Sequence, residues 1–217
     1  MKDAFRIFWE ALKDFWDELF LLALMNIVTV LLAIPVITLP PALAGLWNVS
    51  NRLANGRGID WQDYFDGLRR YFCKVWGLAL LNALVVVILL TNIWFYGQEN
   101  IPFTLSENVR TLMQAFFVIA GGLWLLYQMY PLAMLLEQED QRLRVALRNA
   151  AVVSLTNPVF TIVLGLLLLI VAIISTFLPM LWPLITLALF AVVCNKAALY
   201  LLEPYRERMK SEQGNET

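Results

Sequence analysis

One lysine could carry chemistry, because it is the only charged residue well inside a long apolar segment. Lys196 lies in AVVCNKAALYLLEP, with Asn195 beside it. A charge at bilayer depth is costly, so such a residue either serves a function or extends its side chain to the headgroups. Two interpretations therefore stay open for Lys196: snorkelling to the interface, or contact with a ligand or lipid headgroup.

Uncharged polar side chains in the apolar segments form a second candidate set. They are Asn26, Thr29, Asn82, Thr91, Asn92, Gln114, Gln128 and Asn195. Residues of these types hydrogen-bond between helices in membrane proteins, and this is the simpler interpretation. A polar lining for a sugar-like solute is the alternative.

The sequence offers little for catalysis. It contains no histidine, which removes the most versatile proton carrier and metal ligand. The serines Ser50, Ser106, Ser154 and Ser175 lie in no nucleophile motif, no glycine-rich phosphate loop is present, and the two cysteines, Cys73 and Cys194, are far apart. We therefore expect no catalytic residue, no metal, no cofactor and no enzymatic activity.

The elements that must position these residues are membrane spans. The chain is 60% hydrophobic and 15% charged, whereas soluble domains average about 45–50% and 25%. Five segments approach or exceed the roughly 20 apolar residues that cross a bilayer: 19–39, 77–97, 112–136, 158–177 and 182–202. All should be helical, because backbone polar groups cannot be left unpaired in lipid. A net charge of −1 indicates no nucleic-acid partner.

Three amphipathic helices are predicted between or before the spans, over 1–18, 60–76 and 140–157. Asp60 is placed to cap the second helix. Exposed arginines on the last two, Arg69, Arg70, Arg142 and Arg148, could contact lipid or a partner, as could Lys196. A span that ends in a proline and a small-residue helix occurs twice, at Pro41 and Pro131, which suggests an internal repeat.

The stretch IPVITLPPALAGLWNVSNR, residues 34–52, decides the topology. If it only kinks one span, the N-terminus is external. If the chain turns at Pro40 and Pro41 and returns as a short helix over 40–55, only Arg110 of the basic residues outside the spans lies on the outer side. The positive-inside rule favours this hairpin. We expect Pro35, Pro40, Pro41, Gly45 and Pro131 to serve turns and close helix packing.

Residues 34–72 also resemble the YesL-like family of bacterial integral membrane proteins, which has no established activity. The resemblance rests on Pro35, Thr38, Pro41, Ala42 and Ala44, followed by Arg52, Tyr64, Phe65, Tyr71 and Phe72. It covers roughly residues 20–100; LPP replaces the usual glycine before the proline. Members are described as membrane components associated with carbohydrate uptake, so the resemblance implies a membrane location and such an association, but no site residue.

These observations predict one all-α domain: a polytopic helical membrane bundle with five long transmembrane helices, a short proline-initiated return helix and amphipathic interfacial helices. No signal-peptide pattern precedes the first span, so we expect that span to be retained. Residues 203–217 should form a cytoplasmic tail. We expect a multi-pass protein of the bacterial inner membrane with both termini cytoplasmic. We expect the lipid bilayer and transporter subunits as partners. The expected role is that of a non-enzymatic accessory or scaffold component of solute uptake, and only the family resemblance points to carbohydrates as the solute. A small permease for a polar uncharged solute is the alternative.

Overall fold

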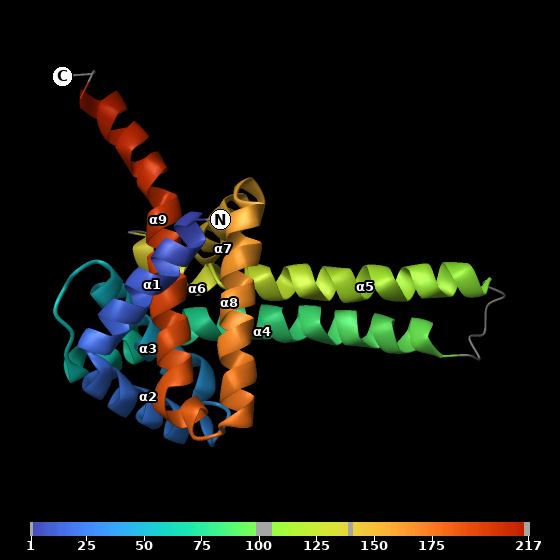
Figure 1. The fold of residues 1–217 in the computed structure, drawn as a ribbon, viewed down its shortest axis with the longest axis horizontal. Coiled ribbons are helices and arrows are strands. Elements are labelled where there is room, and N and C mark those ends of the chain that lie inside the picture. The colour runs from blue at the N-terminus through green and yellow to red at the C-terminus, as the bar shows by residue number, and fades with distance from the viewer. Residues whose placement is uncertain (1, 99–105, 139–140, 215–217) are drawn as a thin grey trace.

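The computed structural model describes residues 2–98, 106–138 and 141–214, and this part of the chain is helical without a strand. Figure 1 shows the arrangement of its helices. They are α1 (Lys2–Asp17), α2 (Leu19–Ala33), α3 (Leu39–Ala54), α4 (Trp61–Gly97), α5 (Glu107–Tyr127), α6 (Pro131–Glu137), α7 (Leu143–Thr156), α8 (Pro158–Phe177), a π-helix (Trp182–Thr186) and α9 (Leu187–Gly214). Four helical segments, or five if α1 and α2 count as one bent span, are long and apolar enough to cross a membrane. The predicted fold class is confirmed.

The N-terminal amphipathic helix turns away from the first apolar helix. α1 and α2 meet at Glu18 with a bend of 91°. One side of α1 is buried through Ala4, Ile7, Ala11 and Phe15, while the aromatic side chains of Phe5, Trp9 and Trp16 are exposed. α1 is therefore a separate helix that packs on the body, and its outer aromatic rings are free to contact lipid headgroups.

The proline stretch forms a turn followed by a returning helix. α2 ends at Ala33, α3 begins at Leu39, and Pro40 and Pro41 occupy the first helical positions. Asn26 of α2 hydrogen-bonds Ala188 at the start of α9, whereas Asn51 of α3 bonds Asn195 further along it. α2 therefore leads towards the start of α9, and α3 returns along α9 in the opposite direction. The expected first span, 19–39, is six residues shorter in the structure, because Pro35 cannot continue a helix.

The second amphipathic segment and the second span form one helix. We expected 60–76 and 77–97 as separate elements, but α4 runs without a break from Trp61 to Gly97. Gly77 alone does not interrupt a helix whose backbone hydrogen bonds continue on both sides of it. The predicted cap is confirmed: the Asp60 carboxylate accepts from the Trp61 N–H at 2.6 Å, within a capping box completed by Asp63.

Three later boundaries also differ from the expected ones. The span expected over 112–136 breaks after Tyr127, because Pro131 starts a new helix, α6. The basic helix expected over 140–157 is α7, Leu143–Thr156, and residues 139–140 lie outside the described residues. The expected tail, 203–217, is helical through Gly214, since α9 continues past Pro204. α8 has the expected bounds, 158–177.

The helices form a body and an arm. α9 lies at the centre of the body, and its alanines Ala188, Ala191, Ala197 and Ala198 are buried and let α1 and α3 approach closely. The arm consists of α5 and most of α4, which run side by side across the direction of α8 and α9 in Figure 1. The apolar helices therefore form two groups, and the most apolar windows of α4 and α5 have no buried residue.

Candidate functional site

A carboxylate at the end of α6 is the centre of the most connected polar cluster in the described structure. The Glu137 side chain is only 9% exposed. Its Oε1 accepts hydrogen bonds from the amides of Asn51 and Asn55, the latter at 2.9 Å, and its Oε2 pairs with the guanidinium of Arg206. Glu137 thus joins α3, α6 and α9 at one point. A buried carboxylate needs such donors, because they replace the hydrogen bonds to water that the charged group loses on burial.

Local sequence explains how each donor reaches Glu137. Asn51 and Asn55 are four residues apart and so lie on one face of α3 and its C-cap. Asn51 also donates to the Asn195 Oδ1 of α9 at 3.2 Å, and the Asn195 amide donates to the Trp47 carbonyl at 3.4 Å. A single chain of amides therefore connects the middle of α9 to the carboxylate.

A second polar group lies next to the first, where α3 faces α4. Arg52 Nε pairs with Asp63 Oδ2 at 3.0 Å, and the Asn48 amide donates to the Asp63 carbonyl at 2.8 Å. Further along α4, the Gln141 amide links Lys74 and Tyr71 through bonds of 2.8 and 2.9 Å. These groups border a polar cleft of about 370 Å³, which Glu137 also lines. Most polar groups of this cleft are bonded to one another, so it is built as a junction between helices.

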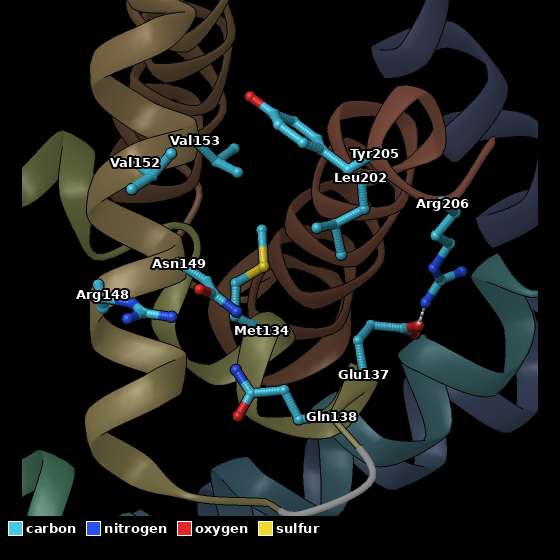
Figure 2. Close-up of a pocket in the computed structure, with 10 residues that line it drawn as sticks. All are labelled: Met134, Glu137, Gln138, Arg148, Asn149, Val152, Val153, Leu202, Tyr205 and Arg206. Carbon is cyan, nitrogen blue, oxygen red and sulfur yellow. Dashed lines mark hydrogen bonds and ion pairs between the residues drawn. The ribbon is translucent and has the colours of Figure 1, made fainter. Parts of the chain in front are cut away.

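A less polar pocket of about 430 Å³ lies beside Glu137, between α6, α7 and α9. Figure 2 shows its lining: Met134, Glu137 and Gln138 from α6 and its C-cap, Arg148, Asn149, Val152 and Val153 from α7, and Leu202, Tyr205 and Arg206 from α9. Its volume is within the range of small-molecule sites. An apolar floor with a few polar groups at the rim is suited to binding an amphipathic molecule, and nothing in the lining suggests a reaction.

The structure gives Lys196 a partner inside the chain. Its ammonium group pairs with the carboxylate of Asp14 on α1, and both side chains are mostly buried. The pair joins α1 to α9. Neither interpretation of Lys196 made from the sequence included Asp14, because the two residues are 182 positions apart.

The other sequence-predicted residues are spread over the fold. Pro40 and Pro41 start α3, Pro131 starts α6, and Pro35 lies in the exposed turn after α2. Gly45 lies directly against Tyr64 of α4. The arginines Arg69, Arg70, Arg142 and Arg148 are all exposed on α4 and at the start of, or within, α7. Of these four, Arg148 lines the pocket of Figure 2 and Arg70 lines the polar cleft.

Four of the eight uncharged polar residues, Asn26, Thr29, Asn82 and Asn195, form hydrogen bonds to other helices, as the simpler interpretation predicts. Asn26 donates to the Trp182 carbonyl and accepts from the Ala188 N–H, both at 2.8 Å. Thr29 bonds the Tyr64 hydroxyl at 2.9 Å, and Asn82 accepts from the Trp124 indole at 2.8 Å. Asn92 instead bonds its own helix. Asn26 is buried and satisfies backbone groups next to the π-helix, where the regular helical pattern changes.

Sequence reasoning missed Glu137. It directly follows the predicted span 112–136, where a charged residue is expected at the end of an apolar segment. A usable signal was present nonetheless: a lone carboxylate at a helix end, two asparagines spaced four apart on a predicted helix, and an asparagine inside a later span. Such polar groups at membrane depth need partners, and each could have been assigned to the others.

The comparisons with known proteins concern the first part of this site. Residues 19–93 match the family model described as "Protein of unknown function, DUF624". The resemblance to an uncharacterised family is thereby confirmed over this segment. The DUF624 segment spans α2, α3 and all but the last residues of α4, so it holds Asn51, Asn55, Arg52 and Asp63. Glu137, Arg206 and the pocket of Figure 2 lie beyond it. No curated protein and no solved structure matches the chain.

Proposed function

We propose that the protein is a non-enzymatic accessory or scaffold component of a bacterial inner membrane, associated with a transporter for solute uptake. Its basic end and both termini face the cytoplasm in this proposal. The observation that carries it is the set of exposed arginines on the first turns of α4 and on α7. Arginine is enriched at protein interfaces, and Arg69, Arg70 and Arg148 are exposed on the surface of these two helices.

The use of polar groups inside the fold supports an accessory role. Asn26, Thr29, Asn82 and Asn195 bond other helices, and Lys196 pairs with Asp14. Groups engaged in this way stabilise the packing and are poorly available to a passing solute. The proposal also fits the positive-inside count, because the hairpin topology puts Arg110 alone of the basic residues outside the spans on the outer side.

One observation favours a small permease as a second candidate. The backbone is broken between α2 and α3, where Val36 has a φ of 54°, and a π-helix interrupts the start of α9. Transporters use broken helices to bind solutes near the middle of the bilayer. Here, however, Ile34, Val36 and Ile37 are exposed at the tip of a turn, which is a less suitable place for a binding site.

Affinity purification from native membranes would test the proposal. We expect transporter subunits to accompany the intact protein, and the combined change Arg69→Glu and Arg70→Glu to remove them. Arg110→Glu is the matched control, because it reverses a charge at the far end of the arm and should retain the partners. Uptake of a defined solute by the pure protein in liposomes would refute the accessory role and support the permease.

Orientation can be tested separately. Asp3→Cys in a Cys73→Ala background places a single exposed thiol near the N-terminus, since Cys194 is buried. In intact cells an impermeant thiol reagent should leave this cysteine unmodified, whereas in permeabilised cells it should react. Labelling in intact cells would contradict a cytoplasmic N-terminus.

A further inference from the structure

We infer that the pocket between α6, α7 and α9 binds one anionic phospholipid from the basic side of the membrane. This ligand site goes beyond the proposed function and does not depend on it. Its lining has two parts: the apolar side chains of Met134, Val152, Val153 and Leu202, here called the floor, and the polar side chains, here called the rim groups (Figure 2).

The charges of the lining favour an anionic headgroup. Three charged residues line the pocket: Glu137, Arg148 and Arg206. Glu137 and Arg206 pair with each other and leave no net charge. Arg148 is exposed and has no ion-pair partner among the described residues. The pocket therefore carries one uncompensated positive charge, which complements the single negative charge of a phosphodiester.

The other rim groups add neutral hydrogen-bond donors. Asn149 is next to Arg148 on α7, and Tyr205 lies opposite on α9. An amide and a phenolic hydroxyl can donate to phosphate or glycerol oxygens. Arg148 and Asn149 lie side by side and suit a phosphate ester, whereas the Tyr205 hydroxyl points away from them in Figure 2.

The floor and its position favour a lipid over a free anion. Met134, Val152, Val153 and Leu202 offer an apolar surface that a free phosphate would not use. Val152 is 46% exposed, so the floor is continuous with the outer surface of α7. The pocket also lies where α8 begins at Pro158 and the apolar part of α9 ends near Leu202. Both positions mark the level of the headgroups, where basic pockets between helices bind anionic lipids.

Lipid-dependent stabilisation of the purified full-length protein in neutral detergent would test the site. Phosphatidylglycerol should raise the unfolding temperature in a saturable way, with an apparent affinity at least tenfold higher than that of phosphatidylcholine. Inorganic phosphate alone should have no comparable effect. Equal responses to the two lipids would overturn the inference, and so would an equal response to phosphate, because that would show a simple anion site.

Three variants locate the effect. Arg148→Gln should weaken phosphatidylglycerol binding about tenfold, the factor expected for one lost charge-assisted hydrogen bond. Val152→Trp should fill the floor and have a similar effect. Arg144→Gln removes an exposed arginine of α7 that does not line the pocket, and it should bind as the unmodified protein does. If all three variants kept full affinity, the lipid would bind outside this pocket. Native mass spectrometry, which counts retained lipids per chain, should give one for the unmodified protein and none for Arg148→Gln.

Discussion

A close crossing of α3 and α4 predicts how a single methyl group should act. α3 and α4 cross with a glycine from each: Gly45 faces Tyr64, and Gly67 faces Asn48. A Cβ at Gly67 would lie 2.5 Å from the Asn48 Cβ and 3.2 Å from the Ala44 carbonyl oxygen. A Cβ at Gly45 would lie 2.7 Å from the Tyr64 carbonyl oxygen. Gly67→Ala and Gly45→Ala should therefore force the two helices apart.

The expected cost follows from two opposing effects. Carbon atoms pack best at about 3.5–4.0 Å, so the helices must separate by about 1 Å at Gly67. Overpacking of this kind costs about 1–3 kcal/mol. Alanine in a helix regains about 0.5–1 kcal/mol relative to glycine. The two ranges give a net loss of about 0–2.5 kcal/mol for Gly67→Ala, with a midpoint of about 1 kcal/mol. Each kcal/mol lowers the unfolding temperature by about 2–4 °C for a chain of this length.

Thermal unfolding in detergent, followed by near-UV circular dichroism, would measure the effect. Gly121→Ala and Gly122→Ala in α5 are the matched controls, because nothing lies within 4 Å of a Cβ at either position. They make the same chemical change and should be neutral or slightly stabilising. Adding Asn48→Gly should relieve Gly67→Ala, so that the double variant is no less stable than Asn48→Gly alone. If Gly67→Ala unfolded at the same temperature as Gly121→Ala, the close crossing would be refuted.

Three further substitutions test the polar contacts. Asn26→Leu should lower stability by about 2–4 kcal/mol, because it leaves the Trp182 carbonyl and the Ala188 N–H without partners; Asn92→Leu, which loses only a bond within its own helix, should change little in the same thermal assay. Glu137→Gln removes the charge that holds Arg206, so limited trypsin digestion should cleave after Arg206 several-fold faster; an unchanged rate would contradict the anchoring role. Lys196→Leu and Asp14→Leu should each destabilise the protein, and the double variant should lose less than their sum, with a coupling of about 0.5–3 kcal/mol in unfolding measurements; additivity would show that the pair does not interact.

Local signals in the sequence predicted the elements well where one residue type decides a boundary. Pro158 fixed the start of α8, Asp60 capped α4, and Pro40 and Pro41 started the returning α3. In each case the cause is local to that residue: proline lacks the backbone N–H, and the Asp60 carboxylate accepts from an N–H that has no carbonyl partner in the first turn. Such effects act over one helical turn and can be read without the fold.

The sequence was less informative where distant packing decides. Hydropathy changes near residue 77, and this change suggests two helices. A helix continues through such a change when its backbone hydrogen bonds are kept, so composition alone does not show that α4 is one helix. The pairing of Lys196 with Asp14, and of Glu137 with Asn51 and Arg206, depends on how α1, α3 and α6 meet α9. Helix faces are predictable from periodicity, but the identity of the facing helix is not.

The unbroken length of α4 has a mechanical consequence for the protein in the membrane. Its 37 residues span about 55 Å at about 1.5 Å per residue, whereas hydrocarbon is only about 30 Å thick. α5, with 21 residues, matches a single crossing. If α4 stands upright, about 25 Å of rigid rod, which is its amphipathic beginning, must emerge into water. A tilt of the immersed half would then swing that emerging end sideways, together with the α3 crossing attached to it.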